Sequence, residues 1–178
     1  MNDFSATTVL MVRHRDRVTM ASDGQVSFNN TIIKSNANKV KRAGDGKVLV
    51  GFAGGAADGL ALFSRFEDKL SEHQGNLERA VVELAKDWRT DRVMRQLQAH
   101  MIVTDLEQSF LTSGNGDLMQ PDADGVLAIG SGANFALAAA RALMRHTDKT
   151  ATEIVREAMT IAAEICVFTN DQLTLEEL

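Results

Sequence analysis

Short runs of β-branched and apolar residues, separated by polar turns, dominate the first third of the chain. Such runs are typical of strands that bury one face or both. They predict a hairpin of residues 7–14 and 18–22, short strands at 31–33 and 39–41, and a buried strand at 48–52. The first third of the chain is therefore expected to be mostly β-sheet.

The spacing of apolar residues then changes from that of a strand to that of a helix. Apolar side chains recur at nearly helical intervals at Leu60, Phe63, Phe66 and Leu70. Gly75 follows as a stop signal, and Asn76 is a favourable N-cap for a second helix. The apolar positions of this second helix form one stripe: Leu77, Ala80, Val81, Leu84, Ala85 and Trp88. Two consecutive helices are therefore predicted.

The second half of the chain repeats this succession of strands and helices. Strands are predicted at 100–104, 109–112 and 126–129, helices at 134–145 and 152–168, and an edge strand at 173–178. The turn Gly114-Asn115-Gly116 closes the first two of these strands. Thr150 and Glu153 have the spacing of a capping box, which predicts the start of the last helix.

The element order predicts the fold class α+β. Strands, two helices, strands and two further helices follow one another, without the regular strand-helix alternation of a parallel doubly wound sheet. The pattern allows a sandwich of two sheets with a helical pair on each outer side. Periodicity alone does not choose this sandwich over other α+β arrangements.

Composition and charge narrow the class of protein. The 178 residues are 44% hydrophobic and 24% charged, which is the balance of one globular domain. The net charge of -5 comes from interleaved signs, so no basic stripe favours nucleic acid or an anionic membrane surface. Cys166 is the single cysteine, which excludes an intrachain disulfide and a multi-cysteine zinc site. Without a signal peptide or membrane span in the sequence, we expect a cytoplasmic protein.

Several familiar catalytic motifs are absent from the sequence. The Rossmann, P-loop and HExxH patterns do not occur, and the four histidines lack ligand spacing. Gly130-Ser131-Gly132 superficially suggests a serine-hydrolase elbow. That motif requires glycine two residues to either side of the serine, where this chain has Ile129 and Ala133. A metal hydrolase and a serine hydrolase of this type are disfavoured.

Thr7 is the unusual chemical feature, because it begins a strand after only six residues, Met1 to Ala6. An internal threonine hydroxyl is a poor nucleophile. If the Ala6–Thr7 bond is cut, the freed α-amino group, with a reference pKa of roughly 7.7 to 8.0, becomes a base for the adjacent hydroxyl. A Thr-Thr pair at the head of a strand also follows from β-propensity alone, so the residues by themselves leave both interpretations open.

Several longer stretches match those of a known peptidase family in the same order. They include TTVLMVRH from Thr7, ASDGQV, NKVKR, GFAGGAAD, TSGNGD and LAIGSGANFALAAARAL. Almost from Thr7 to Leu178, the chain resembles the HslV (ClpQ) family of proteasome-like N-terminal nucleophile hydrolases. The resemblance implies a four-layer αββα sandwich. It also implies that Met1 to Ala6 are a propeptide, that residues 7–178 form the single peptidase domain, and that Thr7 is the catalytic threonine.

The resemblance assigns four further residues to the catalytic site. Lys39 matches an active-site lysine whose charge disfavours protonation of the amine and stabilises the threonine oxygen, and Asp23 matches the acid that orients this lysine. Gly54 matches the glycine whose backbone N–H forms the oxyanion hole. Ser131 matches a serine that helps proton transfer near the amine. The structural alternatives are a solvated lysine, an Asp-Gly turn, a strand-to-helix turn and a helix N-cap.

The resemblance also implies a sodium ion and partners. Backbone carbonyls of Ala163, Cys166 and Thr169 match the sodium loop of the family, although a helix C-terminus there would expose the same oxygens. No organic cofactor is implied. The implied assembly is a dodecamer of two stacked hexameric rings, which works with an HslU (ClpY) AAA+ ATPase on unfolded proteins. Two rival functions are a silent structural subunit that keeps its leader and an amidase acting on small amides.

Overall fold

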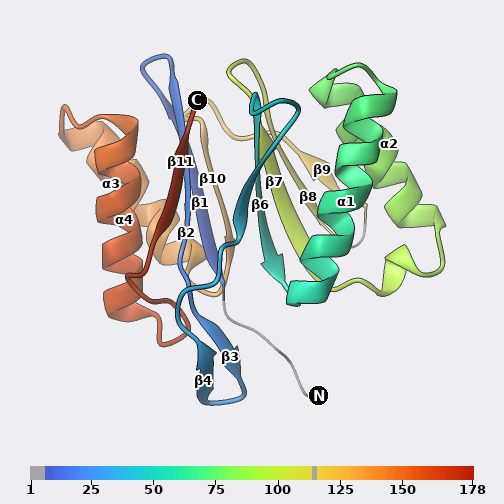
Figure 1. Ribbon diagram of the computed structural model, residues 1–178. Coiled ribbons are helices and arrows are strands. Elements are labelled where there is room, and N and C mark those ends of the chain that lie inside the picture. Colours follow the sequence, from blue (N-terminus) through green and yellow to red (C-terminus); the bar gives the residue numbers. More distant parts are fainter. Residues whose placement is uncertain (1–6, 114–115) are drawn as a thin grey trace.

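Two antiparallel sheets pack face to face in the computed structural model, which describes residues 7–113 and 116–178 (Figure 1). The first sheet has the strand order β10-β1-β2-β11, with β1 (Thr8–His14), β2 (Arg17–Ser22), β10 (Val126–Gly130) and β11 (Thr174–Glu177). The second has the order β5-β6-β7-β8-β9, with β5 (Val40–Ala43), β6 (Val48–Gly54), β7 (Ala99–Thr104), β8 (Ser109–Ser113) and β9 (Leu118–Met119). The strands β3 (Val26–Phe28) and β4 (Thr31–Lys34) form a separate hairpin.

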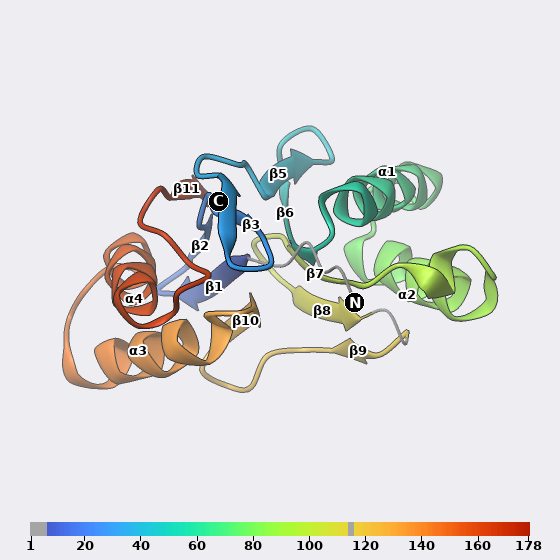
Figure 2. The ribbon, with the colours of Figure 1, turned by 90° about the horizontal axis from the view of Figure 1, so that it is seen from below.

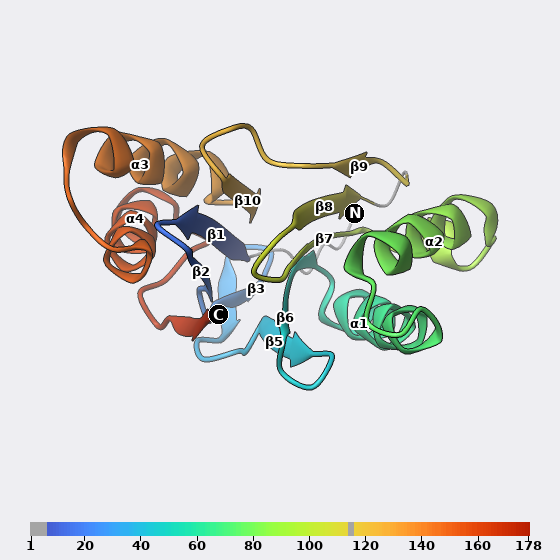
Figure 3. The same ribbon diagram turned by 90° about the horizontal axis from the view of Figure 1, so that it is seen from above.

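Helices cover the outer face of each sheet. They are α1 (Ala56–Glu72), α2 (Leu77–Thr90), α3 (Ala133–His146) and α4 (Ala151–Ile165), with the short 3-10 helix η1 (Met94–Gln96) after α2. The pair α3 and α4 lies on the first sheet, and the pair α1 and α2 lies on the second (Figures 2 and 3). The four layers form the expected αββα sandwich, so the predicted α+β fold class is confirmed.

Strand β1 shows how one strand serves two apolar layers. Val9 and Met11 belong to the core between the sheets, whereas Leu10 and Val12 pack in the core beneath α3 and α4. All four side chains are fully buried. Because side chains alternate along an extended chain, the side chain of Thr7 falls on the inter-sheet side of β1.

Arg13 links the two sheets at the other end of β1. Its guanidinium donates hydrogen bonds to Thr104 Oγ1 (3.1 Å) and Ser109 Oγ (2.8 Å), and to the backbone oxygen of Asp105 (2.7 Å). Partial burial lowers the pKa of Arg13, and the charge of Asp105 opposes this shift. This arginine joins the middle of the first sheet to the β7–β8 turn of the second.

Local signals predicted most helix boundaries. The Asn76 side chain caps α2 by accepting a hydrogen bond from the amide of Arg79, and Thr150 and Glu153 form the expected capping box of α4. The prediction of a helix over 152–168 is wrong at its end. The helix α4 ends at Ile165, because Cys166 has an extended backbone with φ of -92° and ψ of 114°.

Other details differ from the sequence interpretation or lie outside it. The strands β3 and β9 and the helix η1 were not predicted, and all three have at most three residues. The alternative of Ser131 as a helix N-cap is wrong, since Gly132 occupies that position of α3 without a side-chain hydrogen bond. The expected leader, Met1 to Ala6, and the turn residues 114–115 lie outside the described residues. Within the described ranges, no helix is long and apolar enough to span a membrane.

Candidate active site

The peptide that joins Thr7 to Thr8 is held from both sides. The backbone oxygen of Thr7 accepts a hydrogen bond of 2.8 Å from the amide of Ser131, which follows β10. The amide of Thr8 donates a hydrogen bond of 2.8 Å to Asp23 Oδ1, just after β2. Both neighbouring strands of β1 therefore fix the orientation of this one peptide plane. Thr7 itself is only 5% exposed.

Gly130 makes this close approach to Thr7 possible. Its φ is +97°, a backbone conformation that residues with a side chain rarely adopt. A Cβ atom on Gly130 would lie 1.7 Å from the backbone oxygen of Thr7. The glycine is thus required by the position of Thr7 at the head of β1.

Asp23 is the central acceptor of the site and is fully buried. Besides the Thr8 amide, its Oδ1 accepts a hydrogen bond from Lys39 Nζ at 3.1 Å. Its Oδ2 accepts hydrogen bonds from the amides of Gln25 (2.9 Å) and Asn170 (3.3 Å). Four donors satisfy the carboxylate, which explains how this charged group is tolerated inside the protein.

Lys39 forms a buried ion pair with Asp23. The lysine side chain is 6% exposed and the aspartate side chain 0%. Lys39 Nζ also donates to the backbone oxygen of Gln25. Burial lowers the pKa of Lys39 from its ordinary value of 10.5, whereas the charge and the hydrogen bond of Asp23 oppose this shift. The predicted pairing of Asp23 with Lys39 is present, and the lysine is not solvated.

The hydroxyl of Thr8 joins β1 to two segments on its helix side. Thr8 Oγ1 accepts a hydrogen bond from the amide of Gly132 at 2.8 Å and lies 2.7 Å from Thr169 Oγ1. Thr8 is fully buried and Thr169 is 4% exposed. A Cβ on Gly132 would lie 2.5 Å and 2.6 Å from these two hydroxyl oxygens. The hydroxyl pair therefore fits only beside a glycine.

Replacing Thr8 with valine is expected to lower the free energy of unfolding by about 1–3 kcal/mol, because the buried Gly132 amide and Thr169 hydroxyl each lose a partner. Valine keeps the branched shape, so packing changes little. Urea denaturation at a fixed protein concentration measures the change. Thr8→Ser is the control and should stay close to the parent protein; equal losses in both variants would contradict this role of the hydroxyl.

Gly54 and Ser131 flank Thr7 on the exposed surface. Gly54 ends β6 with φ of +127°, and a Cβ there would lie 2.2 Å from the backbone oxygen of Gln98. Its neighbour Ala53 has a Cβ only 3.4 Å from the place that a Cβ on Gly130 would take. The two sheets thus meet closely beside Thr7, and both Gly54 and Ser131 are accessible there.

Of the three residues predicted to bind sodium, Ala163 lies in the last turn of α4, and Cys166 and Thr169 lie in the turn that follows it. The helix ends at Ile165, so its last carbonyl groups, including that of Ala163, lack intrahelical amide partners. The carbonyl of Cys166 accepts a hydrogen bond from the amide of Thr169 at 3.0 Å, which folds the turn. Carbonyl oxygens in such a turn suit a hard monovalent cation. No group of three or more His, Cys, Asp or Glu side chains able to hold a metal occurs within the described ranges.

Sequence reasoning missed several residues that shape the site. Thr8 was visible only as the second residue of the Thr-Thr pair, and Gly130 and Gly132 only as the flanks of a failed hydrolase motif. Asn170 had no signal of its own, although it donates to Asp23 and accepts from the amide of Gly24 at 3.0 Å. Gln25 acts through its backbone, which no side-chain pattern predicts.

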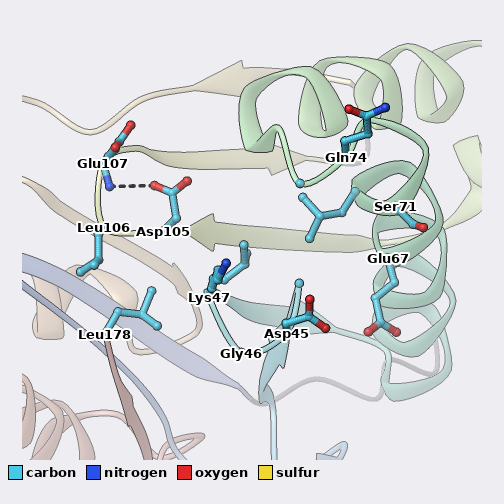
Figure 4. A pocket seen from close by; sticks show the side chains of 14 residues that line it. Asp45, Gly46, Lys47, Glu67, Ser71, Gln74, Asp105, Leu106, Glu107 and Leu178 are labelled. Atoms are coloured by element: carbon cyan, nitrogen blue, oxygen red, sulfur yellow. Dashed lines mark hydrogen bonds between the residues drawn. The ribbon is translucent and has the colours of Figure 1, made fainter.

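A pocket of about 910 Å³ lies away from this site (Figure 4). It is bordered by α1, by the β5–β6 turn with Asp45 and Lys47, by the β7–β8 turn with Asp105 and Glu107, and by Leu178. None of the predicted site residues lines it. The candidate site is therefore at the opposite end of β1 from this pocket.

Comparison with known proteins agrees with the fold. A family model described as "Proteasome subunit" matches residues 4–178. The chain therefore belongs to the proteasome subunit family. Two curated relatives have the description "ATP-dependent protease subunit HslV". The one from Thermosipho africanus is 57% identical over 97% of this chain and 98% of its own length. The one from Pseudothermotoga lettingae is 54% identical over 99% of each chain.

A solved structure shows the same relationship. The crystal structure of eukaryotic HslV from Trypanosoma brucei matches with a TM-score of 0.92 and 45% sequence identity, over 96% of this chain and 98% of that chain. Within the proteasome family, this chain groups with the HslV proteins, as its sequence motifs indicate.

Proposed function

We propose that this chain is the peptidase subunit of an ATP-dependent, proteasome-like protease, with Thr7 as its nucleophile. One observation supports this function most directly: Asp23 Oδ1 accepts hydrogen bonds from both the Thr8 amide (2.8 Å) and Lys39 Nζ (3.1 Å). A single oxygen atom therefore connects the peptide after Thr7 to a buried lysine. A positive charge in this place stabilises the negative charge that develops on the threonine oxygen as it loses its proton.

In the proposed reaction, the free α-amino group of Thr7 takes the proton from its own Oγ1, which attacks the carbonyl carbon of a substrate peptide bond. The backbone N–H of Gly54 stabilises the resulting oxyanion. The tetrahedral intermediate then collapses, and the amine half of the substrate leaves with the transferred proton. The acyl half remains as an ester on Thr7, which a water molecule activated by the same amine hydrolyses.

The other site residues keep this nucleophile in place and tune it. Lys39 disfavours protonation of the amine and stabilises the developing charge on Thr7 Oγ1. Asp23 holds Lys39 and the Thr8 amide together. Ser131 assists proton transfer through its hydroxyl, while its amide holds the backbone oxygen of Thr7.

Activity should require cleavage of the Ala6–Thr7 bond. While Ala6 is attached, the nitrogen of Thr7 belongs to an amide and cannot serve as a base. Intact-mass measurement of active material is expected to show that Met1 to Ala6 are missing from the 19.4 kDa chain. Peptide hydrolysis by protein that retains all six residues would contradict the mechanism. Retention of these residues together with complete inactivity would instead favour a silent structural subunit.

In the proposed function, the chain works as part of an assembly in the cytoplasm. We propose a dodecamer of two hexameric rings, an HslU-type ATPase as the partner that supplies unfolded chains, and unfolded proteins as substrates. The carbonyl groups of Ala163, Cys166 and Thr169 would hold a sodium ion, which would stabilise the turn after α4. That turn leads directly to Asn170, whose amide contacts Asp23.

A further inference from the structure

Three residues form a row across the second sheet at the end where Thr7 lies. Ala53 on β6 pairs directly with His100 on β7, and His100 pairs directly with Ser113 on β8. Gly54, the proposed oxyanion donor, follows Ala53 and ends β6. Beyond this row, β6 and β7 are joined only by the pair of Gly54 and Ala99.

The side chain of His100 points to the inter-sheet side of β7. Ala99 and Met101 belong to the core beneath α1 and α2, whereas Ile102 belongs to the core between the sheets. Side chains alternate along a strand, so His100 shares the face of Ile102. His100 is exposed although Ile102 is fully buried, which places the imidazole at the open edge of the inter-sheet layer.

This edge lies beside the nucleophile. The Cβ of Ala53 is 3.4 Å from the place that a Cβ on Gly130 would take, and that place is 1.7 Å from the backbone oxygen of Thr7. Neighbouring strands are about 4.8 Å apart, so the backbone of His100 lies one strand beyond Ala53. The strand β10, which ends at Gly130, packs over both β6 and β7. The side chain of Thr7 falls on the same inter-sheet side.

We propose that His100 is a specificity-determining residue of the peptidase site and favours substrates with an uncharged hydrogen-bonding side chain, such as glutamine, over aliphatic ones. This inference rests on the proposed function of Thr7. An imidazole carries at least one N–H donor in either protonation state. Next to it, Ser113 Oγ donates to Asp117 Oδ2 at 3.3 Å, so a carboxylate already stands on this side of the row. An amide side chain can accept from His100 without adding a second negative charge beside Asp117.

The test compares peptides that differ by glutamine or leucine at one position flanking the cleaved bond. These side chains have similar volumes, so the ratio of their kcat/KM values reports hydrogen bonding. At one of the positions flanking the cleaved bond, His100→Leu is expected to lower the glutamine-to-leucine ratio of kcat/KM values about three- to tenfold. His100→Gln keeps an N–H donor and should preserve the ratio. If His100→Leu loses all turnover, the same comparison is made between His100→Ala and His100→Gln.

His146→Leu is the matched control. His146 is an exposed histidine in the last turn of α3, whereas it is the first turn of this 14-residue helix that lies at the site. Its ratios should equal those of the parent protein. Ratios within twofold of the parent at every position in His100→Leu would overturn the role of His100. Absence of Thr7-dependent turnover in the parent protein would instead overturn the proposed function.

Discussion

Replacing Thr7 with alanine is expected to reduce peptide hydrolysis by about a thousandfold or more, since the nucleophilic oxygen is lost while the amine and Lys39 remain. Alanine keeps the backbone hydrogen bonds that hold the head of β1. The amide of Ser131 still donates to the oxygen of residue 7, and the amide of Thr8 still donates to Asp23. A fluorogenic peptide assay on processed protein measures the effect.

Two controls separate loss of the nucleophile from loss of structure. Thr7→Ser retains a hydroxyl beside the amine and should keep measurable turnover. Thr31→Ala removes a hydroxyl from the exposed strand β4 and should leave turnover unchanged. Full activity in Thr7→Ala would refute Thr7 as the nucleophile, and equal inactivity of Thr31→Ala would point to a defect in folding.

The fold was predictable wherever one local signal dominated. Asn76 and the Thr150–Glu153 pair marked helix starts, because an N-cap satisfies orphan amides within its own turn. The end of α4 was predicted three residues too late, because the apolar residues continue to Phe168 with helical spacing while the chain has already turned at Cys166. That turn is stabilised by long-range contacts, such as that between Thr169 and Thr8, which the local pattern does not contain.

The site was predictable only in part for a related reason. Thr7, Asp23 and Lys39 were assigned by family resemblance, and the structure brings Asp23 and Lys39 together around the Thr7–Thr8 peptide. Gln25 and Asn170 both donate to Asp23 through backbone amides, which no side-chain pattern predicts. The catalytic roles of Thr7, Asp23, Lys39, Gly54 and Ser131 remain predictions, as does sodium binding by the carbonyl groups at the end of α4.

Removing the charge of Asp23 should lower the free energy of unfolding more than removing the charge of Lys39. Asp23→Asn leaves the lysine buried and replaces one acceptor oxygen with a donating NH2 group, which must face backbone amides. We expect it to lower the free energy of unfolding by about 3–5 kcal/mol. Lys39→Met leaves a carboxylate that still accepts from the amides of Thr8, Gln25 and Asn170. Its expected cost is smaller, about 1–3 kcal/mol.

Activity should not follow this order of stability, because both variants remove the charge arrangement around Thr7. Each is expected to lose about a hundredfold or more in kcat. The double variant Asp23→Asn/Lys39→Met is informative, since neutralising both partners leaves no unpaired buried charge. It should be more stable than Asp23→Asn alone and yet equally inactive. Urea denaturation at fixed protein concentration and peptide hydrolysis provide the two measurements. A double variant that regains activity together with stability would show that the pair serves folding alone.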